Sequence, residues 1–451
     1  MTEHVIVVDL GYGDAGKGGV VDWLCARSAR SARSARPQDR KVTAVVRFNG
    51  GAQAAHHVAG PGGAVHAFAQ FGSGTFTRGM RTFLSRFMLV DPLAMTAEAD
   101  HLSKLKVPDP FGLVTVDRDA LLTTPYHQAA NRARETARRA ARHGSCGMGI
   151  GETARYAADS PADAPRGGDC ETRQILMRKL TLLRDRLAEE TGFQRAGQPP
   201  PSVLADVYGA WARRVTLARD GHLAALLRQG PVVFEGAQGV LLDEWRGFHP
   251  YTTWSTTTFA NALTLLAEAG ARDGAIRLGV TRCYLTRHGP GPFVTEDTTL
   301  DLPEPHNGTG RWQGPFRTGH LDAVALRYAA QVAGGLDAVA LTHLDVAWRH
   351  QGRLRLCREY TAGERRIQRL APGPDRDLGH AERLTRMLLS ARPVYDDAER
   401  IGAGDWPDAV AEIAGAPVTI RSHGPAAAHK TAAAHTTDAR SRPPALAAPP
   451  R

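Results

Sequence analysis

The sequence lacks the features of a disulfide-stapled or membrane-spanning protein. Its 451 residues include only five cysteines, an odd number with no Cys-x-x-Cys pair, which favours reduced thiols over a disulfide framework or a zinc site. No apolar run approaches the length of a membrane span. The opening residues, MTEH, lead straight into an apolar strand-like run and not into a secretory signal. We therefore expect a cytoplasmic protein that does not bind membranes.

Aromatic residues are missing from the most basic part of the chain. The formal net charge is +10, and part of the excess lies in the repeat RSARSARSAR at residues 27–36. Nucleic-acid binding usually combines basic patches with stacking aromatics, so this composition does not favour a nucleic-acid partner. We interpret residues 27–40 as a basic loop inserted between a helix at 20–26 and a strand at 42–46. A basic surface also attracts anionic substrates.

A hydroxyl is missing from the most informative motif, VIVVDLGYGDAGKG at residues 5–18. An apolar strand there runs into a glycine-rich turn, and Gly11, Gly16 and Lys17 satisfy the GxxxxGK half of a phosphate-binding loop. Gly18 stands where a Ser or Thr would hold magnesium, which argues against a standard P-loop ATPase. Asp14 lies inside the loop, where a carboxylate repels phosphate unless a metal or a titratable proton intervenes. The loop therefore indicates chemistry at a bound nucleotide.

Further blocks extend this motif over most of the chain. They read VVRFNGGAQAAHH (45–57), FEGAQGVLLD (234–243), PYTT (250–253), GPGPFVTE (289–296), TGHLD (318–322), THLD (342–345) and SHGP (422–425). With the loop, these ordered blocks resemble the adenylosuccinate synthetase family. Several ordered blocks are much more specific than any single motif.

The pattern of apolar runs predicts the fold class α/β, with a large, mostly parallel central sheet and flanking helices. The expected strands are 5–8, 42–46, 232–234, 276–280 and 339–341, and further helices are expected at 128–143 and 169–191. No clean linker interrupts the chain, so we expect a single domain over residues 1–425. Residues 426–451 lack apolar periodicity and are expected to form a disordered tail.

The resemblance implies a GTP-dependent ligase that forms a C–N bond at the 6-position of a purine nucleotide. In this family GTP phosphorylates the 6-oxygen of IMP, and L-aspartate then displaces phosphate to give adenylosuccinate, GDP and phosphate. Asp14 matches the general base, His56 the histidine at the phosphate bridge, Lys17 a stabiliser of the transferring group, and Gln238 the residue that holds the activated oxygen. Magnesium is the implied cofactor and GTP the co-substrate.

The resemblance also implies binding residues and a homodimer, in which Arg166 reaches across to the partner's acceptor site. The implied GTP-binding residues are Gly13, Gly16, Lys17, Gly18, His343, Asp345, Ser422 and Gly424. The implied acceptor-nucleotide residues are Asp14, Gln53, Cys146, Arg166, Gln238 and Thr253. The implied amino-acid residues are Thr309, Arg311 and Arg317, and the implied metal ligands are Asp14 and Ala55.

Departures from the family pattern cluster around the substrates. Gly19 and His343 each replace a lysine, Cys146 replaces a threonine that contacts phosphate, and apolar residues enter the loop at 308–322. A specialised paralogue using a modified purine nucleotide or another amino donor is therefore an alternative. A non-catalytic nucleotide-binding or GTPase-like regulatory protein is a second one. The joint retention of the four expected catalytic residues argues against the latter.

Overall fold

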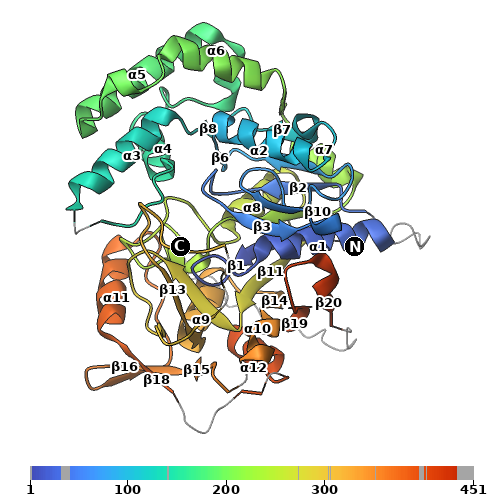
Figure 1. Ribbon diagram of the computed structural model, residues 1–451, viewed down its shortest axis with the longest axis vertical. Helices are drawn as coiled ribbons and strands as arrows, with labels where there is room; N and C mark the ends of the chain where they lie inside the picture. Colours follow the sequence, from blue (N-terminus) through green and yellow to red (C-terminus); the bar gives the residue numbers. More distant parts are fainter. Residues whose placement is uncertain are drawn as a thin grey trace, which may run out of the picture.

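A ten-stranded sheet runs through the centre of the molecule (Figure 1). The computed structural model describes residues 3–31, 41–139, 142–272, 274–302, 304, 306–350, 352–395, 401–402 and 404–433. The strand order is β20-β19-β14-β11-β1-β10-β2-β5-β7-β9, and all neighbours pair in parallel except β20 with β19. The predicted α/β class with a mostly parallel sheet is thus confirmed. The strands are β1 (His4–Asp9), β2 (Ala44–Arg47), β5 (Arg81–Leu84), β7 (Val114–Val116), β9 (Thr216–Leu217), β10 (Val232–Glu235), β11 (Ala275–Arg282), β14 (Ala338–Thr342), β19 (Val418–Ser422) and β20 (Lys430–Ala432).

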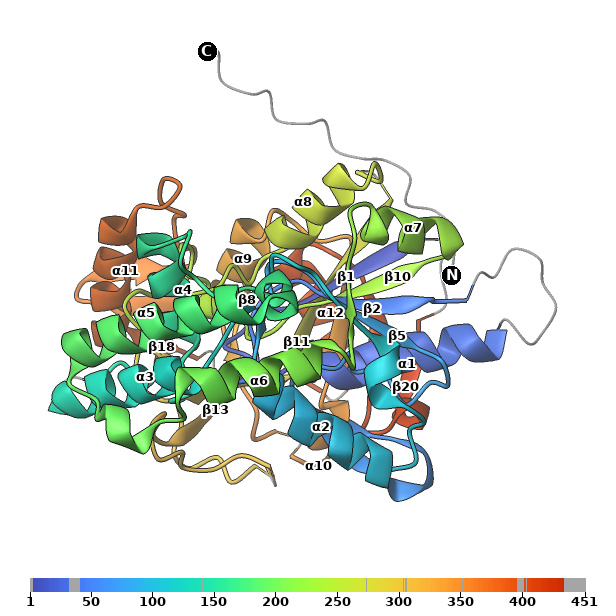
Figure 2. The same cartoon turned by 90° about the horizontal axis from the view of Figure 1, so that it is seen from above.

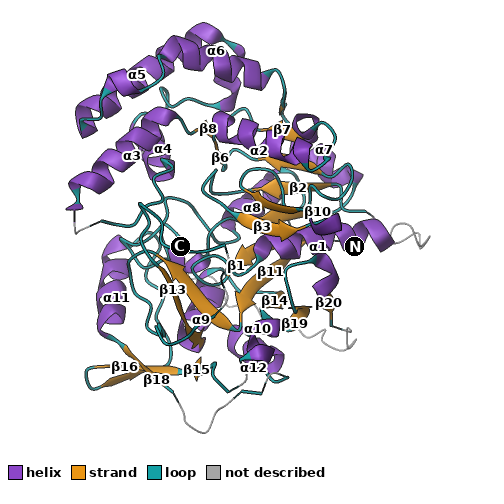
Figure 3. Cartoon of the chain, viewed as in Figure 1, coloured by secondary structure: helices purple, strands orange, loops and turns teal. Residues whose placement is uncertain are grey.

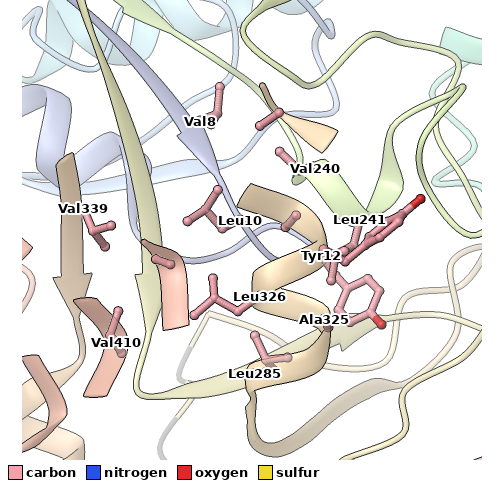
Figure 4. Packing of buried hydrophobic residues seen from close by; sticks show 14 of the residues in the cluster. Val8, Leu10, Tyr12, Val240, Leu241, Leu285, Ala325, Leu326, Val339 and Val410 are labelled. Carbon is pink, nitrogen blue, oxygen red and sulfur yellow. The ribbon is translucent and has the colours of Figure 1, made fainter. Parts of the chain in front are cut away.

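Helices cover both faces of this sheet (Figure 3). Alternate side chains of a strand point to opposite faces, so Val5 and Val7 pack with α1 (Lys17–Ser31) while Ile6 and Val8 pack into a larger core. Part of that larger core is drawn in Figure 4, where Leu10, Tyr12 and Leu241 lie beside α9. The helices that bury side chains in it include α7 (His222–Gln229), α8 (Ala260–Glu268), α9 (Ala323–Val332), α10 (Leu344–Arg349), α11 (Leu378–Ser390) and α12 (Trp406–Ala414).

A second group of helices lies beyond the β7 side of the sheet, in the upper part of Figure 1, and in Figure 2 it is seen from above, in front of the sheet. These helices share their own apolar cluster with the hairpin of β3 (His56–Ala59) and β4 (Val65–Phe68). The group consists of α2 (Pro92–Lys104), α3 (Pro125–Ala137), α4 (Ile150–Asp159), α5 (Arg173–Thr191) and α6 (Pro201–Ala212). The expected helix 128–143 is therefore shorter and earlier, and the expected helix 169–191 begins with a separate short turn, Gly167–Glu171.

Smaller strands carry segments of the site outside the central sheet. An antiparallel pair, β12 (Tyr284–His288) and β13 (Phe316–Asp322), brackets the loop 289–315, and β13 also pairs with β15 (Leu356–Cys357). Two further sheets are β16 (Glu359–Ala362) with β17 (Arg365–Ile367) and β18 (Arg392–Val394), and β6 (Leu89–Val90) with β8 (Leu121–Leu122). The described residues contain no helix long and apolar enough to cross a membrane. All five cysteines are free.

The sequence-based prediction places the start of the disordered tail at residue 426, but the structure describes the chain through residue 433. Residues 427–429 form a short 3₁₀ helix, and β20 pairs with β19 through Ser422 and Lys430. Strand pairing with β19 and the buried ammonium of Lys430, and not a hydrophobic stripe, hold this segment. Residues 434–451 lie outside the described residues, as do 32–40 of the expected insertion; its first part, residues 27–31, is the last part of α1.

Candidate functional site

The glycine-rich loop between β1 and α1 is organised by a carboxylate at the strand end. Asp9 is buried, and it accepts hydrogen bonds from the amides of Gly11 and Ala15, both at 2.8 Å, and of Gly13 at 3.3 Å. The ammonium of Lys17 donates to the same carboxylate at 3.1 Å. The Gly13 amide, expected to face GTP, is thus used inside the protein. The first N–H groups of α1 have no partners within the helix and remain the natural anion-binding part of the loop.

The absence of a side chain at residue 18 is explained by His56, which lies against this position. A Cβ atom built at Gly18 would lie 2.7 Å from the Cβ of His56 and 3.0 Å from the Ser73 hydroxyl. A serine or threonine there would therefore collide with the β3 segment. The motif lacks a hydroxyl at residue 18 because His56 lies so close to the first turn of α1 that no side chain fits there.

Asp14 lies at the tip of the loop in a left-handed conformation, with φ of 60°. Its carboxylate, 31% exposed, lies 3.1 Å from Nε2 of His288, and its carbonyl accepts from Nε of Arg282 at 2.6 Å. Burial works against ionisation, but the hydrogen bond and charge of His288, with the charges of Arg282 and Lys17, lower the pKa of Asp14 to about 2. Asp14 is therefore ionised at neutral pH and able to accept a proton. Sequence reasoning missed His288, which precedes a matched block.

His56 is held by a buried acid that the sequence did not single out. Its Nδ1 lies 2.6 Å from Oε1 of Glu235, at the end of β10. Glu235 also accepts from the Ser73 amide at 2.9 Å and from the Ser73 hydroxyl. Burial opposes its ionisation, but the charge of Arg47 and the contacts of His56 and Ser73 lower the pKa of Glu235 to about 2. With Nδ1 occupied, Nε2 of His56 is the nitrogen left for a ligand.

Gln238 lies beside the loop on a constrained turn. Its φ is 57°, and its Cα lies 3.9 Å from a Cβ built at Gly13. Asn49 holds this turn, because its side chain accepts from the amide of Ala237 at 2.7 Å and donates to the carbonyl of Ala237 at 3.0 Å. The Gln238 side-chain oxygen and both amide atoms of Gln53 are buried without a hydrogen-bond partner among the described residues. Such orphaned polar atoms are typical of a site built for a ligand.

The expected base-binding residues meet at the end of β14. Thr342 donates to the carbonyl of Ala15 at 2.8 Å, which ties this strand end to the loop. His343 adopts a left-handed conformation, and its Nδ1 lies 2.8 Å from the Thr342 hydroxyl. Burial, with the charges of Arg282 and Lys430, holds the pKa of His343 well below its ordinary value. The imidazole that replaces the family's lysine is therefore neutral.

A cavity of about 320 Å³ opens next to this strand end, lined by Leu344, Asp345, Trp348, Arg349 and His423. It contains the expected guanine reader, Asp345, whose carboxylate forms an ion pair with Arg349. His423 stands between the expected Ser422 and Gly424, and the Ser422 hydroxyl donates to the Gly424 carbonyl at 3.1 Å. Exposed Trp348 adds an aromatic wall that the sequence-based prediction did not include.

The expected acceptor residues lie on separate segments. Cys146 precedes α4, and burial raises the pKa of its thiol. Arg166 precedes the turn Gly167–Glu171, and its guanidinium donates to the Asp119 carbonyl at 2.7 Å. The amide of Thr253 donates to the Leu242 carbonyl at 2.8 Å. The acceptor-binding roles of Cys146, Arg166 and Thr253 therefore stay predictions.

In the loop expected to bind the amino acid, Arg317 is hydrogen-bonded to neighbouring residues of the protein. Arg317 donates to Glu296 at 2.7 Å and to the carbonyls of Gly289 at 2.7 Å and Gly291 at 3.0 Å. Arg311 is exposed and lies over the Trp312 ring at 5.2 Å, while Thr309 is exposed. Of the two arginines expected to bind the amino acid, Arg317 is thus already paired with a carboxylate of the protein.

Ala55, the other expected metal ligand, is exposed and directly precedes His56. The described residues contain no group of three or more His, Cys, Asp or Glu side chains that could hold a metal ion. Mg²⁺ needs no such group, because it commonly uses one or two protein oxygens together with substrate phosphates. The ionised, partly exposed carboxylate of Asp14 fits that pattern.

Comparison with known proteins agrees with this arrangement. The family model described as adenylosuccinate synthetase matches residues 6–429. An adenylosuccinate synthetase of Acidithiobacillus ferrooxidans is 33% identical, with 77% of this chain and 78% of the relative aligned. One of Alkalilimnicola ehrlichii is 32% identical, with 94% and 96% aligned.

Two solved structures share the fold. Fully ligated adenylosuccinate synthetase from Plasmodium falciparum superposes with a TM-score of 0.77 at 21% identity, covering 96% of this chain and all of that one. The succinoaminodeoxyadenylate synthetase of cyanophage S-2L, bound to dGMP and dATP as an energy donor, gives 0.58 at 17% identity, covering 96% and 95%. The chain belongs to the adenylosuccinate synthetase family of GTP-dependent carbon–nitrogen ligases.

Proposed function

We propose that the protein joins L-aspartate to IMP at the expense of GTP, forming adenylosuccinate, GDP and phosphate. The observation that carries this proposal is the convergence on one loop of a carboxylate, a histidine–glutamate pair and an orphaned amide, at Asp14, His56 with Glu235, and Gln238. A protein that only bound nucleotide would have no use for this combination. As a family enzyme acting on nucleoside phosphates, it is proposed to work in the cytoplasm as a homodimer without nucleic acid.

The residues divide the work between proton transfer and charge stabilisation. Asp14 takes the N1 proton of the purine, which pushes electron density onto the 6-oxygen as that oxygen attacks the γ-phosphorus. Lys17 and the first amides of α1 stabilise the charge on the transferring group. Gln238 holds the 6-oxygen. The amine then attacks carbon 6, and phosphate leaves with the oxygen.

His56 is set to act on the phosphate through Nε2. Burial lowers the pKa of His56, and Glu235, which accepts the Nδ1 proton, offsets this only in part through its hydrogen bond and negative charge. The negative charge of bound GTP would shift this balance towards the protonated ring. Nε2–H would then donate to the bridging oxygen as its bond to phosphorus breaks.

Magnesium would be held by the Asp14 carboxylate, with the Ala55 carbonyl as a second ligand, and would neutralise charge on the phosphates of GTP. Asp14 suits this role because it is ionised and partly exposed.

A second candidate function keeps the ligase chemistry but changes the amine. Arg317 is committed to Glu296 and two backbone carbonyls, and Trp312 and Phe316 bring apolar surface to the same loop. A dicarboxylic donor would have to displace Glu296 from Arg317, whereas an amino acid with one carboxylate would not.

One assay separates these functions. The protein is incubated with GTP or ATP, Mg²⁺, a panel of purine monophosphates and either L-aspartate or other amino acids. Phosphate release and new products are followed by mass. Adenylosuccinate formed from IMP and aspartate supports the first function, whereas product only with another amine or acceptor selects the second. Phosphate release without any adduct would contradict both.

A further inference from the structure

Lys430, in the segment first expected to be a tail, has a buried ammonium with a complete set of partners. Its Nζ donates to the carbonyls of Gly424 at 3.3 Å, Pro425 at 3.1 Å and Ala426 at 3.2 Å. A lysine ammonium has three N–H donors, so these carbonyls use all of them. Burial lowers the pKa of Lys430 to about 8, and the charge of Asp22 partly offsets this. The group therefore acts through the chain segment that it holds and not by binding a ligand directly.

The segment held by Lys430 is a wall of the expected base site. Ser422 pairs with Lys430 across β19 and β20, and its hydroxyl donates to the Gly424 carbonyl. The amide of His423 donates to the carbonyl of His429 at 2.9 Å, and His423 lines the cavity that contains Asp345. Three carbonyls directed at one ammonium thus set the path of the turn between the cavity and β20.

The other side of Lys430 lies against the phosphate loop. A Cβ atom built at Gly19 would lie 3.1 Å from Nζ and 3.6 Å from the Pro425 carbonyl. A side chain at this position of α1 would therefore be tight against the ammonium and would touch the turn. Ala426 also bridges to Ala59 in β3, the strand that begins with His56. The turn is consequently fixed between α1 and β3, and α1 contacts the short 3₁₀ helix at 427–429 that leads into β20, which lies near α1 in both views (Figures 1 and 2).

We propose that Lys430 is a positioning residue for the purine base of the nucleotide donor: it fixes the turn Ser422–Ala426 against α1, in space left open by Gly19. The cation beside this part of α1 thus comes from a residue far along the chain. The inference rests on the proposed function only for the identity of the nucleotide.

Binding of GMP, GDP and GTP to Lys430→Met distinguishes positioning from direct contact. Methionine fills most of the space but has no donor, so the turn loses three hydrogen bonds to a charged group. We expect the dissociation constant, measured by titration calorimetry, to rise about tenfold. The rise should be equal for the three nucleotides, because the base is common to all of them. Lys430→Arg, which keeps donors, should restore most of the affinity.

The exposed Lys104 provides the matched control, since Lys104→Met also removes one positive charge but lies on α2. An unchanged affinity in Lys430→Met would overturn the inference, as would a loss that grows from GMP to GTP, which would mean direct phosphate contact. A loss not relieved by arginine would also overturn it. Should Lys430→Met not fold, Lys430→Gln takes its place in the same comparison. Failure of the wild-type protein to bind any guanine nucleotide would instead contradict the proposed function.

Discussion

Asp14 combines a strongly lowered pKa with partial exposure at the tip of the loop. Its hydrogen bond with His288, with the charges of Arg282 and Lys17, keeps the carboxylate ionised, which suits both a proton acceptor and an oxygen ligand for magnesium. The same low pKa makes it a weak base in isolation. Proton removal by Asp14 is therefore coupled to formation of the new oxygen–phosphorus bond. The negative charge that would build up on the 6-oxygen is used in that bond.

Replacing Asp14 with asparagine tests this role. Asn has nearly the same shape but cannot take up the proton, so we expect kcat to fall about a thousandfold. GTP binding should be largely retained, because Lys17 and the α1 amides are unchanged. Product formation by mass and GTP titration by calorimetry measure the two effects. Asp100→Asn, an exposed acid on α2, is the control. An undiminished rate in Asp14→Asn would remove Asp14 from the role of base.

At the scale of elements, the first turn of α1 is shaped by what packs against it. Gly18 leaves room for His56 and Gly19 leaves room for Lys430. Two adjacent glycines weaken a helix start, and the structure uses both of them for close approach. The lack of a hydroxyl at residue 18 thus reflects packing.

Gly18→Ser tests this explanation, because it would restore the hydroxyl of a standard phosphate loop. The new Cβ would lie 2.7 Å from the Cβ of His56. We expect lower activity and a loss of about 1–3 kcal/mol in the free energy of unfolding, as for other overpacked sites. Urea unfolding and initial rates measure both. Gly197→Ser is the control, since a Cβ there meets nothing within 4 Å. Activity equal to or above that of wild type would contradict the packing argument.

The start of α3 contains a buried histidine that should make stability depend on pH. Nδ1 of His127 accepts from the amide of Thr124 at 3.1 Å as part of a capping box. Burial, with the charge of Arg155, lowers the pKa of His127 to about 3. The unfolded chain, with an ordinary histidine pKa of about 6.5, binds the proton more readily. Stability from this group is therefore present above about pH 6.5 and is lost as the pH falls towards 3.

His127→Gln keeps a capping side chain that does not titrate. We expect the wild-type free energy of unfolding to fall by about 2 kcal/mol more than that of His127→Gln between pH 7 and pH 5. Urea unfolding at the two pH values measures this difference. Parallel losses in both proteins would show that His127 is not the titrating group.

At the scale of the whole molecule, the proposed homodimer makes a prediction about shared sites. If Arg166 serves the partner's acceptor site, Asp14→Asn and Arg166→Leu are each inactive alone. A mixture that exchanges subunits would regain about one quarter of wild-type activity, because half of the dimers are mixed and each has one intact site. Mixing Asp14→Asn with Lys17→Ala is the control, since both residues lie in the same loop of one subunit and no mixed dimer gains an intact site. Rates that stay at background in the first mixture would contradict the shared site.

Much of the fold and the phosphate loop could be predicted from sequence, because both depend on local patterns. Five expected strands correspond to β1, β2, β10, β11 and β14, and their buried runs reflect a parallel sheet covered on both faces. The loop is contiguous, so its glycines, Asp14 and Lys17 are adjacent in the chain before it folds. The resemblance then added residues in blocks far along the sequence.

Tertiary structure alone decided how these residues are held. Glu235 reaches His56 across 179 residues, and Lys430 meets the first turn of α1 from the opposite end of the chain. Arg317 is paired with Glu296, which no spacing rule predicts. Such contacts depend on how separate elements pack, and neither helical nor strand periodicity encodes them. The sequence by itself determined the sheet, the loop and the family chemistry, whereas packing decided which charges are paired and which remain for substrates.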